Sequence, residues 1–184
     1  MRTAIITLTG ETLVQSRFHG TEKLPKEGAD DYEQRTWRNK VHANNDGECV
    51  LFALSIKNCL RDVAKFLSVQ IPGKGKSTYT KHFKAGVVVP RNPKLGVHKN
   101  NVEGEWRHVP ASGVAGDGKR VMRCFPIFRN WKAECEVVII DDTITPEVFE
   151  QHLVEAGRLV GIGSFRPING GIDGRFEVES IQWI

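Results

Sequence analysis

The glycine-rich stretch GIGSFRPINGGIDGRF (Gly161–Phe176) has a position in the chain that constrains the fold. Before it, Thr145-Pro146-Glu147 combines an N-cap residue, a proline at the first helical position and an acid in the first turn. These signals predict a helix from Thr145 to about Ala156, with Gly157 as its stop. After it, Arg175–Trp183 alternates apolar and polar residues and predicts a strand. A dinucleotide-binding loop has the reverse order, strand then helix, so the stretch does not belong to that class.

Two interpretations of the glycine loop remain open from its residues. Without side chains, its backbone amides can turn toward a phosphate, with Arg166 and Arg175 supplying positive charge. Alternatively, the glycines only permit a tight return from helix to strand.

The rest of the chain extends the pattern to a complete domain. Residues Arg2–Thr9 alternate as a strand, and Leu51–Leu67 has a helical period with Ser55 as a candidate N-cap. Glu134–Ile140 is an apolar strand, and a further strand is expected within the segment before it. The order predicts an α+β fold of the ferredoxin-like (RRM-like) type, a βαββαβ core, in a single domain over 1–184. The core spans about 1–72 and 133–184, and residues 11–48 form an irregular excursion with one helical turn near 31–39.

A long basic insertion, residues 73–132, interrupts this core. It carries thirteen Lys or Arg against three Glu or Asp, a net charge of +10, so the remaining residues carry −6 of the overall +4. Such asymmetry is typical of proteins that bind polyanions. The segment GKGKSTYTKHFK within it mixes lysines with Tyr79, His82 and Phe83, a combination suited to phosphate contacts and base stacking. The alternative is a solvated loop whose aromatic side chains fill the core.

Composition excludes several function classes. The chain shows no signal peptide and no apolar run long enough to span a bilayer, so we expect a cytoplasmic protein without a membrane partner. Four cysteines without CxxC spacing indicate reduced thiols, not a metal site or a disulfide framework. No motif for a metal or a cofactor is present, and none is expected.

The segment Ser55-Ile56-Lys57-Asn58-Cys59-Leu60-Arg61 resembles the signature of the RAMP superfamily, the repeat-associated proteins of CRISPR effector complexes. The signature has serine, an apolar residue, lysine, glycine and, further on, arginine; here Asn58 stands in the place of the glycine. The resemblance implies a ferredoxin-like core with a glycine-rich loop between its last helix and last strand. It is greatest for the backbone subunits, which polymerise along a guide RNA and grip it with an inserted thumb.

The resemblance and the charge pattern together predict the residues that bind nucleic acid. The start of the first helix would lie against the RNA backbone, helped by the helix dipole. A solvated face is the alternative for the lysines and arginines of that helix. The predicted contact residues are Ser55, Lys57, Arg61, Arg35, Arg38, Lys74, Lys76, Lys81, Gly161, Gly163, Arg166 and Arg175.

Catalysis is not predicted. The resemblance draws attention to aspartates between the first strand and the first helix, where Asp30, Asp31 and Asp46 lie, and to histidines. No two of the histidines are close enough in sequence to indicate an acid–base pair, and we expect scattered surface positions. The histidines of the excursion and of the basic insertion are His19, His42, His82, His98 and His108.

The sequence therefore predicts a protein that binds single-stranded nucleic acid, RNA rather than DNA, as a homo-oligomer or a subunit of a CRISPR-like ribonucleoprotein. Three alternatives stay open. They are a ribonuclease of the same fold, a phage-encoded mimic that inhibits CRISPR complexes, and a phage protein that binds or anneals single-stranded DNA.

Overall fold

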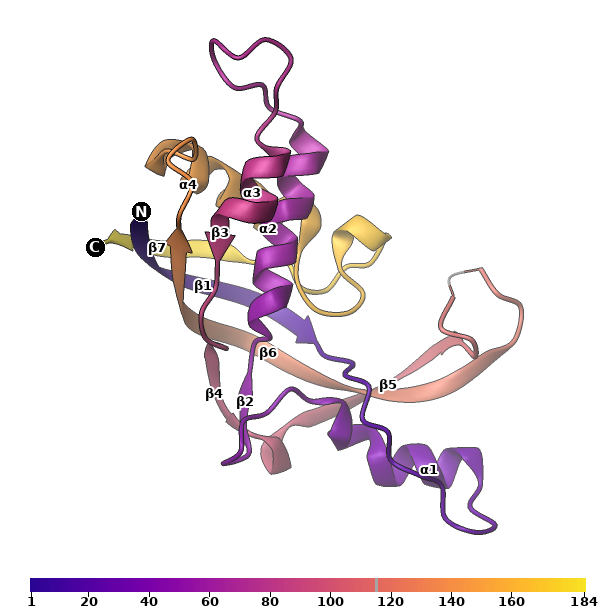
Figure 1. The fold of residues 1–184 in the computed structure, drawn as a ribbon. Helices are drawn as coiled ribbons and strands as arrows, with labels where there is room; N and C mark the ends of the chain where they lie inside the picture. The colour runs from indigo at the N-terminus through magenta and orange to yellow at the C-terminus, as the bar shows by residue number, and fades with distance from the viewer. Residues whose placement is uncertain (115) are drawn as a thin grey trace.

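The structure, a computed structural model, describes residues 1–114 and 116–184 and has an α+β fold (Figure 1). Its central sheet has the order β3-β6-β1-β7, with β5 paired to β6 beyond this path. All these neighbours are antiparallel. The bounds are β1 Arg2–Val14, β3 Val87–Val88, β5 Glu103–Pro110, β6 Arg120–Ile139 and β7 Glu177–Trp183.

Three helices cover one face of this sheet: α2 (Ala53–Leu67), α3 (Thr80–Gly86) and α4 (Pro146–Glu155). Alternate residues of β1, namely Ala4, Ile6 and Leu8, are fully buried because they point toward these helices. The buried faces of α2 and α4, which include Leu60 and Phe149, complete one continuous hydrophobic core.

The opposite face of the sheet is only partly covered and is acidic. Ile5, Thr7 and Thr9 of β1 point to it, and their partners across the sheet share that face. These partners include Glu136 opposite Ile5, Glu134 opposite Thr7 and, on the two sides of Thr9, Glu177 and Lys132, and Lys132 is itself paired with Glu179. A polyanion is therefore not expected to lie on this open face.

The excursion after β1 is more regular than its sequence suggests. β1 continues to Val14, and the helical turn expected near 31–39 consists of α1 (Ala29–Thr36) and the 3-10 helix η1 (Trp37–Lys40). A small second sheet joins β2 (Glu48–Val50) to β4 (Lys94–His98), followed by the 3-10 helix η2 (Lys99–Asn101).

The predicted insertion and core share a strand. β6 runs without a break over twenty residues and contains most of a stretch of the basic insertion with strand character, Lys119–Pro126, and most of the predicted strand Glu134–Ile140. The boundary predicted near residue 132 therefore falls inside β6, whose first part pairs with β5 and whose second part pairs with β1. Figure 1 shows the β5–β6 ribbon projecting from the rest of the sheet.

Two predictions at helix ends were wrong and one was right. Ser55 is not the N-cap of α2: Phe52 holds that position, and the amide of Ser55 donates to its carbonyl oxygen at 2.8 Å. Gly157 does not stop the last helix, which continues as a π-helical turn, η3 (Ala156–Val160), to a cap at Gly161. Thr145 does cap α4, since its hydroxyl accepts the amide of Val148.

Cys49, Cys59, Cys124 and Cys135 are all buried free thiols. Within residues 1–114 and 116–184, no helix is long and apolar enough to cross a membrane.

Candidate nucleic-acid interface

The start of α2, the end of β1 and the glycine loop meet around a small pocket of about 190 Å³. Three predicted contact residues, Ser55, Gly163 and Arg166, line it together although the last two lie more than a hundred residues after the first. The remaining lining residues are Leu13, Gln15, Ser16, His42, Leu51, Phe52, Ile162 and Ser164.

The glycine loop is an ordered structure that closes onto the end of β1. The amide of Ser164 donates to the carbonyl of Val14 at 2.8 Å, and the amide of Ile162 donates to the carbonyl of Gly174 at 2.9 Å. Gly163 has a φ of +78°, and a β-carbon there would lie 2.5 Å from the carbonyl oxygen of Val14. This glycine is needed for the close approach of two backbones. Gly161 is also buried with a positive φ, of +72°, and it caps the end of the preceding helix.

Charge at the edge of the pocket is concentrated around Asp62 of α2. Arg61 donates to its carboxylate at 2.6 Å, and the guanidinium of Arg166 lies 3.9 Å from the other carboxylate oxygen. Arg61 also donates to the side chain of Asn58 at 3.0 Å. Of these charged residues only Arg166 lines the pocket together with Ser55, and its guanidinium suits an anionic ligand there.

The opposite wall of the pocket is formed by residues that the sequence did not single out for binding. The ring of Phe52 stacks on His42 with centroids 5.0 Å apart and an angle of 3° between the planes. Gln15 is buried and fixes this wall, since its amide donates to the carbonyl of Val50 and its oxygen accepts the amide of His42, both at 2.8 Å. Burial, together with nearby Arg17, lowers the pKa of His42, which is therefore neutral at pH 7.

The structure does not bring all the predicted contact residues together. Lys74 and Lys76 lie in the loop beyond the far end of α2, and Lys81 follows on α3 (Figure 1). Ser55 lies in the first turn of α2, so about 18 Å of helix separates it from Leu67, after which Lys74 and Lys76 follow. Lys57 is partly exposed on α2, between the two groups.

The two arginines predicted near residue 37 belong to α1 and η1. Arg35 is held by Glu27 through two hydrogen bonds of 2.7 and 2.9 Å, and Arg38 stacks over the ring of Trp37 at 4.2 Å. Both arginines are exposed, and Arg35 stabilises the excursion before α1 through its bonds to Glu27.

Base stacking by the aromatic residues of GKGKSTYTKHFK was a wrong expectation. Tyr79 and Phe83 are buried and pack against His152, with centroid distances of 5.8 and 4.5 Å. The alternative, aromatic side chains that fill the core, is correct for this segment.

One histidine forms a long-range hydrogen bond that the sequence did not indicate. Nδ1 of His82 lies 2.6 Å from the carboxylate of Asp141, fifty-nine residues away. Its Nε2 is buried, so the pair links α3 to the end of β6 and does not present a base to a ligand.

The net charge of the basic segment overstates its free positive charge. Several of its cations are paired: Arg107 with Glu105 and Asp173, Arg123 with Glu33, Arg129 with Glu105, Lys94 with Glu48, and Lys132 with Glu179.

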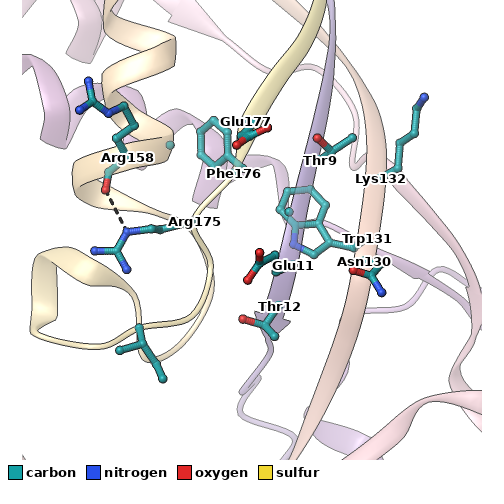
Figure 2. A pocket seen from close by; sticks show the side chains of 13 residues that line it. Thr9, Glu11, Thr12, Asn130, Trp131, Lys132, Arg158, Arg175, Phe176 and Glu177 are labelled. Carbon is teal, nitrogen blue, oxygen red and sulfur yellow. Dashed lines mark hydrogen bonds between the residues drawn. The ribbon is translucent and has the colours of Figure 1, made fainter.

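Arg175 faces a second, larger cavity of about 670 Å³ between β1, β6 and the returning arm of the glycine loop (Figure 2). Nε of Arg175 donates to the carbonyl of Arg158 at 3.2 Å. Glu11, Glu177 and Lys132 also line the cavity, and the buried indole of Trp131 lies beside Gly10. These mixed charges define no single class of ligand.

The aspartates in the region that the resemblance points to are not grouped into a site. Asp30 and Asp31 lie in the exposed first turn of α1, and Asp46 lies in an exposed turn before β2. Among the residues that the structure describes, no cluster of three His, Cys, Asp or Glu side chains could hold a metal ion.

Comparison with known proteins gives a structural likeness without a sequence family. No protein-family model matches the sequence, and no curated protein does. The whole chain superposes with a TM-score of 0.58 and 10% identity on a chain of a solved structure described as "Cryo-EM structure of the Type III-B Cmr-beta bound to cognate target RNA". It spans 60% of that chain. A chain of a "CRISPR RNA-guided surveillance complex" gives a TM-score of 0.40 at 10% identity, with coverage of 97% of this chain and 67% of the other.

At 10% identity, the first likeness shows a shared fold and nothing further about this chain. The fold is therefore of a kind found in a chain of the Type III-B Cmr-beta structure.

Proposed function

We propose that this chain is a RAMP-type domain with a ferredoxin-like core that binds single-stranded RNA as a backbone-type subunit of a CRISPR-like ribonucleoprotein. The order β1, α2, β3, β6, α4, β7 supports the βαββαβ core, as does the position of β1 and β6 at the centre of the sheet. The likeness to a chain of an RNA-bound Cmr-beta complex supports the functional class.

The observation that carries the proposal is the convergence of Ser55 and Arg166 on one small pocket at the start of α2. The positive end of the α2 dipole lies at this turn and favours a phosphate, while the amides of Ala53 and Ser55 are already bound to the side chain of Asn92 and the carbonyl of Phe52. Arg166 adds a guanidinium at the same place. A phosphate of the RNA backbone would occupy this pocket, which gives binding without sequence readout.

The strand would continue along the exposed side of α2, past Lys57, toward Lys74 and Lys76. This path keeps the RNA on the side opposite the acidic open face of the sheet. Further copies of the chain would bind side by side along the same RNA.

The test is a salt titration of binding to a 30-nucleotide RNA. We expect the logarithm of the association constant to fall linearly with the logarithm of the salt concentration. Arg166→Gln should weaken binding and reduce the slope by about 0.7, the contribution of one phosphate contact on a single strand. Arg158→Gln removes an exposed charge that lies outside the pocket and serves as the matched control.

Absence of binding at about 50 mM salt, or binding without salt dependence, would contradict the proposal. Equal or tighter binding of a DNA 30-mer would instead support a protein that anneals single-stranded DNA.

A ribonuclease is the second candidate function, because neutral His42 lines the same pocket as Arg166. A neutral imidazole can accept a proton from the 2′-hydroxyl, and a guanidinium can stabilise the charge that develops on the phosphate. Cleavage that His42→Ala abolishes would establish this activity, whereas RNA that remains intact after prolonged incubation would exclude it.

A further inference from the structure

The glycine loop is fastened to the β5–β6 ribbon through one largely buried arginine. Arg107 of β5 donates to the carboxylate of Asp173 at 2.5 Å, and Asp173 is only 3% exposed. Glu105 orients the same guanidinium with hydrogen-bonding distances of 2.7 and 2.8 Å. Arg107 is thus committed to an internal contact and is not a free cation of the basic segment.

The same guanidinium also holds the residue that precedes Arg166. Phe165 has a φ of +56°, a conformation that non-glycine residues adopt rarely and that surrounding contacts must maintain. Its ring lies 4.7 Å from the guanidinium of Arg107 and packs edge-on against Phe125 at 5.0 Å. The carbonyl of Phe165 accepts the amide of Asp173 at 3.0 Å.

Arg107 therefore contacts both arms of the loop next to Arg166. On one arm it stacks on Phe165, and on the other it pairs with Asp173. We propose that Arg107 is a positioning residue that, through Asp173 and Phe165, holds Arg166 at the pocket and couples the β5–β6 ribbon to RNA binding. The RNA readout of this proposal rests on the proposed function, whereas the loop contact itself does not.

The competing interpretation is that Arg107 contacts RNA directly, like any arginine of a basic segment. The two interpretations give opposite results for Asp173→Asn. Removal of a negative charge strengthens binding if only electrostatics matter. It weakens binding if the ion pair is what sets the position of Arg166.

The experiment measures RNA affinity for Arg107→Gln, Asp173→Asn and the double variant at one salt concentration. We expect each single variant to bind about fivefold or more weakly than the wild type, and the double variant to bind no more weakly than the weaker single one. Arg107→Lys keeps a cation beside Asp173 and should recover part of the loss. Asp117→Asn, which removes an exposed acid from the tip of the ribbon, is the control and should not weaken binding.

A second measurement remains informative if the chain does not bind RNA at all. Hydrogen exchange of the loop amides, including those of Asp173 and Ser164, should be faster in Arg107→Gln and Asp173→Asn than in the wild type. Exchange elsewhere in the core should stay unchanged, which also shows that the variants fold. Unchanged loop exchange, or tighter RNA binding by Asp173→Asn, would overturn the proposal.

Discussion

The fully buried His152 contributes to the pH dependence of the stability of this fold. His152 of α4 is fully buried, and its Nδ1 donates to the carbonyl of Val148 at 2.7 Å. Nε2 is buried as well and has no partner within the described residues. Burial lowers the pKa of His152, and the bond to Val148 only partly opposes this effect.

We predict that the free energy of unfolding falls as the pH drops below about 6.5, the ordinary histidine pKa. Since the folded-state pKa of His152 is lowered, the unfolded chain takes up the proton first, and stability is lost in that window. The loss is at most about 1.4 kcal/mol per pH unit for one group. Urea unfolding at pH 7.5 and pH 5.5 measures it, and His152→Phe should reduce the difference. An identical pH dependence in both proteins would rule out this residue as the cause.

At the scale of elements, α1 is held against the free edge of β6 by a buried carboxylate. Glu33 is 2% exposed; it accepts the amide of Cys124 at 2.8 Å and contacts Arg123 and Lys40. Burial alone would raise the pKa of Glu33, but its hydrogen bonds to these donors outweigh burial and lower it. Lys40 also donates to the carbonyl of Cys124 at 2.7 Å, which completes the contact with β6.

We predict that Glu33→Gln lowers the free energy of unfolding by about 3 kcal/mol, because it leaves Lys40 largely buried without its counter-charge. Urea unfolding measures the change, and proteolysis of residues 15–40 shows whether α1 detaches first. Glu22→Gln, an exposed change in the same excursion, is the control and should stay within about 0.5 kcal/mol of the wild type. A similar effect of the two substitutions would mean that Glu33 does not anchor α1.

Elements with a regular pattern could be predicted from the sequence, whereas those held by long-range contacts could not. The alternation of Arg2–Thr9 and the start signals at Thr145 located β1 and α4. The sequence did not reveal that β6 is continuous, because Pro126 lacks an amide proton and proline is atypical of a strand interior. Asn130, further along β6, adopts a φ of +47°, which is also atypical of a strand.

In the candidate site, too, some residues could be predicted from the sequence and others could not. The motif at Ser55 and the loop at Arg166 were recognisable, and the structure places them on one pocket. Gln15, His42 and Phe52 come from separate segments, and no spacing relates them. Tyr79 and Phe83 follow lysines in sequence but lie in the core, because the composition of a segment does not reveal which side chains face inward.

At the scale of the whole molecule, the distribution of charge gives the chain two different sides. The open face of the sheet presents Glu134, Glu136 and Glu177, whereas α2, α3 and the loop between them carry the exposed lysines. On the proposed function, an RNA strand would be repelled from the first side and attracted to the second. A domain with this polarity binds RNA in one orientation, so successive copies on one strand would present the same surfaces to each other.

We therefore predict that the number of bound copies rises with RNA length. Sedimentation or mass photometry with RNAs of different length, at saturating protein and low salt, would measure the stoichiometry. Because the proposed contacts are to phosphates, RNAs of different sequence and equal length should bind with similar affinity. Arg166→Gln should reduce occupancy on every length, whereas Arg158→Gln should not. One copy per RNA regardless of length would exclude assembly along the strand while leaving RNA binding at the pocket intact.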